Sequence, residues 1–259
     1  MAKIIAISNQ KGGVAKTTTT GAMAAGLKRK GYRVLTVDFD PQGNLSDSVG
    51  AETLESQTMY DLVSKKTGAE KVFDTIQHLE PFDILPTNIM LAGAEVELMS
   101  QSGREYRLKE VLEPVLSQYD YILIDTPPSL GILTSNAFTA ADEVIIPTTA
   151  GIFATQGISQ LNDIVEGIKK YNNPGVKIRG ILITRYNPRT IINQDIKELT
   201  ESLAEHIQAP IFDTYIRNSV VVEEAQANKK DIFTYKENST VSEDYRDFVD
   251  EFLKGEKIA

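Results

Sequence analysis

SNQKGGVAKTT, at residues 8–18, specifies the fold class of this chain. The segment follows an apolar, β-branched run at residues 3–7 and leads into a helical pattern from Thr17 to about Lys30. A tight turn between a strand and a helix presents free backbone N–H groups at the positive end of the helix dipole, and this arrangement binds phosphate. The segment therefore predicts a phosphate-binding loop at the start of an α/β domain.

The loop departs from the general nucleotide-binding pattern, which has glycine six residues and one residue before its lysine. Gln10 and Ala15 occupy those positions, while Lys16 and Thr17 follow the pattern. Lys16 would place its charge on the β- and γ-phosphates, and the Thr17 hydroxyl would bind the bridging Mg²⁺. Lys11 is surplus to this scheme. The alternative is a glycine-rich turn with two incidental solvated lysines, since short motifs also occur by chance.

Two further apolar runs end in acidic residues. The segment YRVLTVDFDPQGN, residues 32–44, carries Asp38 and Asp40, which face the same side of an extended chain. The segment YILID, residues 121–125, ends on Asp125. Ligands of open α/β sheets bind at the carboxyl ends of strands, where a magnesium-phosphate centre uses such carboxylates. Each aspartate alone could instead cap a turn, but three such segments in this order favour a nucleotide site.

The double-lysine loop resembles the deviant Walker A motif of the ParA/MinD superfamily, and the chain looks like a ParA/Soj-type partition ATPase. The matching segments are residues 8–18, 37–44 and 121–129, with weaker similarity in 182–189 and 215–225. The resemblance implies a P-loop NTPase-type α/β fold with a mostly parallel, twisted sheet of about seven to eight strands and helices on both faces. It also implies a Mg²⁺-dependent ATPase that is slow without its partner.

The resemblance also assigns roles to residues. In this superfamily the first lysine of the loop reaches across a dimer interface to the partner's nucleotide, which gives that role to Lys11. Asp40 would orient the attacking water, and Asp38 and Asp125 would belong to the Mg²⁺ shell through water. The expected site residues are catalytic Lys11, Lys16 and Asp40; nucleotide-binding Lys11, Gly12, Gly13, Val14, Ala15, Lys16, Thr17, Thr18, Asn187, Arg217 and Ser219; and metal-binding Thr17, Asp38 and Asp125.

Ala15 stands where most relatives have glycine. Its methyl group would lie where the backbone must approach phosphate closely, so nucleotide affinity or turnover is the property it would change. A protein that holds nucleotide but hydrolyses it negligibly is therefore one alternative to an ATPase. Related ATPases that position other cargoes are another.

The net charge of −9 does not exclude DNA binding, because only the face presented to DNA must be basic. The candidate basic groups are Lys169, Lys170, Lys177, Arg179, Arg185, Arg189, Arg217, Lys229 and Lys230. A solvated surface is the preferred interpretation for most of them. The resemblance selects Arg189 and Arg217 as DNA-binding residues, although Val221 stands where many relatives have a further basic residue.

By the same resemblance, an ATP-bound sandwich dimer binds DNA without sequence preference, and a ParB-like centromere-binding protein stimulates hydrolysis to reset it. The DNA could be chromosomal or plasmid. A MinD-like, membrane-associated regulator of cell division is the rival, because the last helix carries an apolar stripe that includes Phe248 and Phe252. The polar face of that helix is acidic and would repel anionic lipid, so we expect a helix packed on the core and no membrane partner.

Composition agrees with one globular ATPase domain over residues 1–259, with 41% hydrophobic and 24% charged residues. No apolar run approaches the ~20 residues of a membrane span. Because a strand pattern begins at Lys3, we expect no signal peptide, no N-terminal helix-turn-helix domain and a cytoplasmic, nucleoid-associated location. The absence of cysteine excludes cysteine-bound iron–sulfur clusters.

Alternating patterns predict the order of strands and helices. Strands are expected near residues 3–8, 33–38, 82–86, 120–125, 143–147, 178–184 and 210–215. Helices are expected at residues 16–30, 105–118, 155–171, 191–207 and 242–254. Right-handed crossovers would bring Lys16, Asp38, Asp40 and Asp125 to one edge of the sheet. Residues 51–79 have a mixed helical pattern with no motif that we can interpret.

Overall fold

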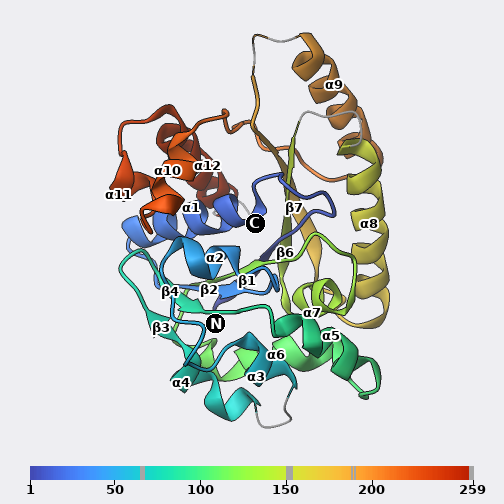
Figure 1. The fold of residues 1–259 in the computed structure, drawn as a ribbon. Coiled ribbons are helices and arrows are strands. Elements are labelled where there is room, and N and C mark those ends of the chain that lie inside the picture. Colours follow the sequence, from blue (N-terminus) through green and yellow to red (C-terminus); the bar gives the residue numbers. More distant parts are fainter. Residues whose placement is uncertain (65–67, 150–153, 188, 190, 257–259) are drawn as a thin grey trace.

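A central sheet organises the computed structural model, which describes residues 1–64, 68–149, 154–187, 189 and 191–256 (Figure 1). Within these residues its strands are β1 (Lys3–Ile7), β2 (Val34–Asp38), β3 (Gln77–His78), β4 (Asp83–Leu85), β5 (Tyr121–Asp125), β6 (Glu143–Thr149) and β7 (Lys177–Thr184). Their order is β3-β4-β2-β5-β1-β6-β7. Every pair is parallel except β3 with β4. The predicted α/β, P-loop-type sheet is confirmed.

Helices cover both faces of the sheet (Figure 1). They are α1 (Lys16–Arg29), α2 (Asn44–Ser48), α3 (Met59–Ser64), α4 (Val72–Thr75), α5 (Leu91–Met99), α6 (Arg107–Leu112), α7 (Ile132–Ala140), α8 (Ala154–Tyr171), α9 (Ile191–His206), α10 (Val221–Ala227), α11 (Ile232–Tyr235) and α12 (Thr240–Glu256). Short 3₁₀ turns lie at Gly68–Lys71, Arg104–Tyr106 and Glu113–Val115. The core residues of α1 and α10 to α12 pack on one face, and those of α3 and α5 to α9 pack on the other.

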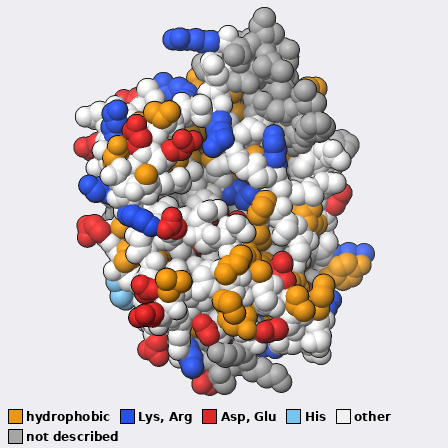
Figure 2. All heavy atoms as spheres, viewed as in Figure 1, with side chains coloured by type: hydrophobic (Ala, Val, Ile, Leu, Met, Phe, Trp, Pro, Cys, Tyr) orange, Lys and Arg blue, Asp and Glu red, His pale blue; other side chains and the backbone are white. Residues whose placement is uncertain are grey.

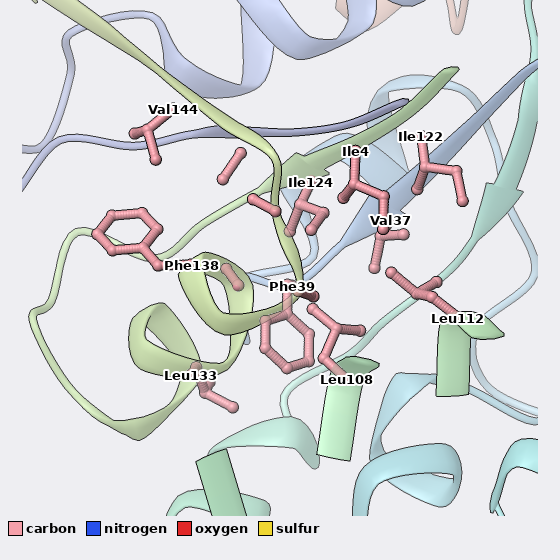
Figure 3. Close-up of a cluster of buried hydrophobic side chains, with 14 of the residues drawn as sticks. Ile4, Val37, Phe39, Leu108, Leu112, Ile122, Ile124, Leu133, Phe138 and Val144 are labelled. Atoms are coloured by element: carbon pink, nitrogen blue, oxygen red, sulfur yellow. The ribbon is translucent and has the colours of Figure 1, made fainter. Parts of the chain in front are cut away.

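Alternation along the strands divides the core into two layers. In β1, Ile4 and Ala6 join one layer, while Ile5 and Ile7 join the other. Figure 3 shows strand side chains of the first layer meeting Leu108 and other helical side chains. Because both faces are covered, these strands are apolar throughout, as in other parallel sheets. Each fully buried aliphatic side chain contributes about 1.5–3 kcal/mol, so the sheet is a rigid base for the loops at its edge.

The C-terminal helix α12 packs on the core. Tyr245, Phe248, Val249 and Phe252 are fully buried, and a Cβ built on Gly26 of α1 would lie only 2.9 Å from the Val249 side chain. The apolar stripe of this helix is thus used inside the molecule, as the sequence predicted. Among the described residues, no helix combines the length and the apolar character that crossing a bilayer requires.

Two sequence predictions were wrong. Residues 210–215 form no strand and make only an isolated bridge at Ile211. The backbone N–H groups of Asp213 and Thr214 donate instead to the Glu251 carboxylate, at 2.7 and 2.9 Å. The helix expected at 105–118 divides into a 3₁₀ turn, α6 and a second 3₁₀ turn. The second turn contains Pro114 near its start, and proline disfavours a continuous α-helix.

The other predicted helices agree with the structure within a few residues. Residues 51–79, whose sequence pattern had no interpretable motif, hold α3, α4, a 3₁₀ turn and the edge strand β3. Residues 65–67 of that segment lie outside the described part of the chain.

Candidate nucleotide-binding site

The phosphate loop connects the central strand β1 to α1. Its backbone enters the left-handed region at Gly13 (φ 73°) and again at Ala15 (φ 64°), directly before the helix begins. The Asn9 amide donates to the Pro147 carbonyl at 2.8 Å and accepts from the Lys11 N–H at 3.0 Å. The Thr184 hydroxyl, at the end of β7, donates to the Val14 carbonyl at 3.1 Å. The loop is thus fixed to β6 and β7, with its N–H groups at the start of α1.

A cavity of about 450 Å³ lies against this loop, and the face in Figure 2 is hollowed near its centre. This volume is within the range of small-molecule and cofactor sites. The lining residues are Gly12, Gly13, Ala15, Lys16, Thr17, Thr18, Asp40, Gln42, Asn44, Asp47, Ser48, Pro128, Arg185, Gln226 and Ala227. A compact anionic ligand with an attached ring would fit such a lining, because glycine N–H groups and a lysine lie beside the polar residues of α2 and α10.

The three predicted aspartates converge beside the loop. Asp38 and Asp125 are register partners on β2 and β5, so their carboxylates leave the sheet at the same edge. Thr17 Oγ1 donates to Asp125 Oδ2 at 2.7 Å. Asp38 accepts from the Ser46 N–H and hydroxyl at 2.8 and 2.6 Å, while Asp40 lines the cavity. The expected gathering of these groups at one edge is confirmed.

Burial changes the proton affinity of these groups. It raises the pKa of Asp38 to about 7, against the effect of its hydrogen bonds from Ser46. Burial and then the Asp38 carboxylate raise the pKa of Asp125 well above its usual value, and burial raises the pKa of Asp40. Burial lowers the pKa of Lys16, although Asp125 and Asp40 oppose that shift. A nearby divalent cation would favour the charged form of these carboxylates. The acidic cluster is therefore a suitable site for a divalent cation.

The residues present fit Mg²⁺ bound together with a nucleotide. Within the described residues, no three His, Cys, Asp or Glu side chains form a protein-only metal cage. Mg²⁺ commonly keeps several waters and takes one or two carboxylates plus substrate phosphates. Thr17 and Asp125, in contact at the start of α1, provide such a partial ligand set.

The two loop lysines differ in position. Lys16 is 7% exposed, and its Nζ donates to the Lys11 carbonyl at 3.3 Å. The Lys11 side chain is exposed, is not part of the cavity lining, and places its Nζ 3.3 Å from Thr149 Oγ1. Lys16 therefore lines the cavity beside its own loop, whereas Lys11 lies outside that cavity.

The other predicted site residues are distributed around the cavity. Arg217 and Ser219 line an adjoining cleft of about 40 Å³, next to Ala15. The Arg217 guanidinium binds the Asp244 carboxylate, with Nε and Nη2 at 3.0 and 2.5 Å. Asn187 lines neither space, and its Oδ1 accepts from the N–H of the exposed Arg189. Val14 is buried.

Sequence reasoning missed several lining residues. Gln42 and Asn44 lie within the acidic segment that carries Asp40, so that motif could have indicated them. Gln226 and Ala227 come from α10, far along the chain, and no local pattern marks them. Arg185 was considered only as a candidate surface cation.

Taken together, the parallel sheet, the loop at the start of α1 and the acidic edge define a P-loop nucleoside triphosphatase. Residues 2–178 match the family model described as an AAA domain, and residues 117–259 match that of 4Fe-4S iron sulfur cluster binding proteins, NifH/frxC family. The chain has no cysteine with which to bind such a cluster.

The chain is 41% identical to the sporulation initiation inhibitor protein Soj of Bacillus subtilis (strain 168), over 97% of this chain and 98% of that protein. It is 37% identical to the chromosome partitioning protein ParA of Myxococcus xanthus (strain DK1622), over 97% of this chain and 88% of that protein. This chain belongs to the ParA/Soj family of the ParA/MinD superfamily, whose P-loop proteins hydrolyse nucleotide.

A solved structure gives a further comparison. The cobyrinic acid a,c-diamide synthase from Mycobacterium smegmatis, with bound ADP and magnesium, is 33% identical and superposes with a TM-score of 0.85, over 99% of this chain and 96% of that one. The name of that protein denotes a different reaction, but its bound ADP and magnesium show that this fold holds both ligands.

Proposed function

We propose that this chain is a partition ATPase that closes into a dimer around ATP and Mg²⁺, binds DNA without sequence preference in that state, and is reset when a ParB-like partner stimulates hydrolysis. The observation that carries the proposal is the division between the two loop lysines. Lys16 lines its own cavity, while the exposed Lys11 side chain lies outside it, with its Nζ 3.3 Å from Thr149 Oγ1. By exchanging this one exposed hydrogen bond, Lys11 would reach a second copy's nucleotide.

The residues of the cavity have distinct tasks in this proposal. The N–H groups of Gly12, Gly13 and the start of α1 bind the phosphates, with Lys16 as a point charge. Thr17 and, through water, Asp38 and Asp125 would hold Mg²⁺, which would neutralise charge on the β- and γ-phosphates. The Asp40 carboxylate is oriented by the Gln42 N–H at 3.1 Å and would position the attacking water.

An apolar surface beside the cavity supports self-association. Ile89, Met90, Val96 and Met99, on α5 and the residues before it, are 65, 56, 72 and 70% exposed. Figure 2 shows hydrophobic side chains gathered over the region of α5. This surface adjoins the cavity through the Gly43 turn. Gly43 lies between the lining residues Gln42 and Asn44, and a Cβ built on it would be 3.1 Å from the carbonyl of Thr87, two residues before Ile89. Such patches mark protein interfaces, and a second copy would cover this one.

The basic residues divide into two groups. Arg189 is exposed and follows Asn187 in the loop after β7, so it is available to DNA phosphates. Arg217 is bound to Asp244, and its main task would be to hold the segment beside the cavity. Contacts to phosphate position a protein on DNA without reading sequence. We therefore assign Arg189 the larger DNA contribution and expect association with the nucleoid.

DNA binding measured with ATP, with ADP and for Lys11→Ala tests the dimer switch. We expect tight binding of wild type with ATP and at least about tenfold weaker binding with ADP or for Lys11→Ala. Equal binding in all three conditions would refute the switch. Asp40→Ala separates hydrolysis from this cycle: it should bind DNA with ATP but lose most single-turnover hydrolysis, by roughly 10²-fold or more. Unchanged hydrolysis in that variant would favour a nucleotide-holding protein over an enzyme.

A further inference from the structure

Arg185 has a backbone conformation that its residue type disfavours. It follows the last residue of β7 and has φ 51°, in the left-handed region. Both neighbours are fixed: the Thr184 hydroxyl shares its proton between the Val14 and Thr148 carbonyls, each at 3.1 Å, and the Tyr186 N–H donates to the Ile216 carbonyl at 2.9 Å. Glycine would adopt this conformation without a steric penalty. The surrounding contacts therefore impose a strained conformation on an arginine.

Arg185 is a lining residue of the cavity. It lines both the 450 Å³ cavity and the adjoining 40 Å³ cleft, and it is exposed. Among the side chains that the structure describes, it has no hydrogen bond or ion pair. Burial raises the pKa of Tyr245, whose hydroxyl is 3.1 Å from Thr19 Oγ1 of α1, and the Arg185 charge is one of the smaller effects that oppose this rise. These observations place Arg185, with no partner among the described residues, where the main cavity meets the cleft.

The position of Arg185 along the cavity indicates which part of a ligand it would meet. The cleft that it shares is lined by Ala15 and Thr18 but not by Thr17 or Asp40. Arg185 is thus at the end of the cavity that adjoins this cleft. The metal and the terminal phosphate would lie at the other end, beside the acidic cluster. Thr18 is one residue beyond Thr17 in the first turn of α1, so the phosphate nearest the sugar would lie at this end.

We propose that Arg185 binds the α-phosphate of the nucleotide and fixes its sugar end at the mouth of the cleft. The inference rests on the proposed nucleotide site and adds a residue to it. A guanidinium has five donors in a planar fork, which suits phosphate oxygens, and its charge-assisted hydrogen bonds are stronger than neutral ones. The strain at Arg185 follows the common tendency of disfavoured backbone conformations to occur at binding sites.

Because ATP and ADP share the α-phosphate, Arg185 contributes to the affinity for both and not to the chemical step. Arg185→Gly removes the side chain and suits the left-handed backbone, so it should raise the urea midpoint while weakening ADP binding about tenfold, as expected for one charged contact. Arg185→Met removes the charge but keeps most of the side-chain volume, and it should lower the affinity for ADP by a similar factor. The charge-matched control is Lys109→Met, on the exposed side of α6, which should bind ADP like wild type.

Titration calorimetry with ADP, AMP and adenosine, together with DNA binding, decides the inference. The expected result is weaker ADP and AMP binding by both Arg185 variants, with adenosine binding unchanged. Wild-type ADP affinity in both variants would overturn the inference and leave the proposed function intact, even if DNA binding fell. An equal loss for adenosine would overturn the α-phosphate assignment. If wild type itself binds neither ADP nor ATP, it is the proposed function that fails.

Discussion

At Ala15 a single methyl group occupies the phosphate loop, on a residue with φ 64° and ψ 33°. This conformation costs an L-residue roughly 1–2 kcal/mol, whereas glycine adopts it freely. The loop tolerates Ala15 because hydrogen bonds at Asn9 and Val14 fix the backbone before it, while the Thr19 N–H donates to the Ala15 carbonyl at 2.9 Å. The departure from the family pattern is thus a matter of local strain, and the surrounding fold accommodates it.

Ala15→Gly should raise the free energy of unfolding by about 0.5–1 kcal/mol, because relief of the left-handed strain exceeds the extra freedom of glycine in the unfolded chain. Urea denaturation of the nucleotide-free protein measures this change. Ala24→Gly, in the buried interior of α1, is the matched control and should lower stability by about 1 kcal/mol or more. A loss of stability in Ala15→Gly would contradict the strain argument.

At the level of elements, α12 holds the segment that flanks the cavity. Asp244 on this helix is 7% exposed and accepts from the Arg217 backbone N–H at 2.8 Å as well as from its guanidinium. Two residues after that arginine, Ser219 lines the small cleft. The helix that sequence alone presented as an apolar stripe therefore also positions part of the candidate site.

Asp244→Asn should lower the free energy of unfolding by about 1–3 kcal/mol, because an amide replaces a carboxylate that accepts charge-assisted hydrogen bonds from a partly buried arginine. The same chemical change at Asp247, exposed on the same helix, should alter stability by less than about 0.5 kcal/mol. Denaturant titration of both variants gives the comparison. Equal, small effects would show that the Arg217 contact is weak.

At the level of the whole molecule, the candidate nucleotide site and the surface proposed for self-association are neighbours. Next to the turn at Gly43, the Thr87 N–H donates to the Ser46 hydroxyl at 3.0 Å, and the exposed side chains of Ile89 and Met90 follow within three residues of Thr87. A conformational change in the segment that carries Asp38 and Asp40, on nucleotide binding, would therefore move the residues of the apolar surface at α5.

Val96→Glu should prevent the proposed ATP-dependent dimer, because a charge would replace an exposed apolar side chain at the centre of the proposed interface. Light scattering of the Asp40→Ala background with ATP should show a dimer, and addition of Val96→Glu should leave a monomer. Leu199→Glu, a similarly exposed position on α9, is the control that should remain dimeric. A dimer in the Val96 variant would remove α5 from the interface.

Much of the fold could be predicted because its signals are local. Apolar runs that end in Asp38 and Asp125, and the loop before Lys16, identify strands whose carboxyl ends meet at one edge. The register of β2 with β5 then brings the acids together. The roles of these residues in binding and hydrolysis remain predictions.

The sequence by itself determined the order of β-strands and helices around the phosphate loop, since hydrophobic periodicity and turn residues act over a few positions. Only the tertiary structure decided which distant groups meet. Residues near 213 donate their N–H groups to Glu251 instead of a strand, Arg217 pairs with Asp244, and Gln226 reaches the cavity. Such contacts depend on how α10 and α12 pack against the sheet, and no local pattern encodes them.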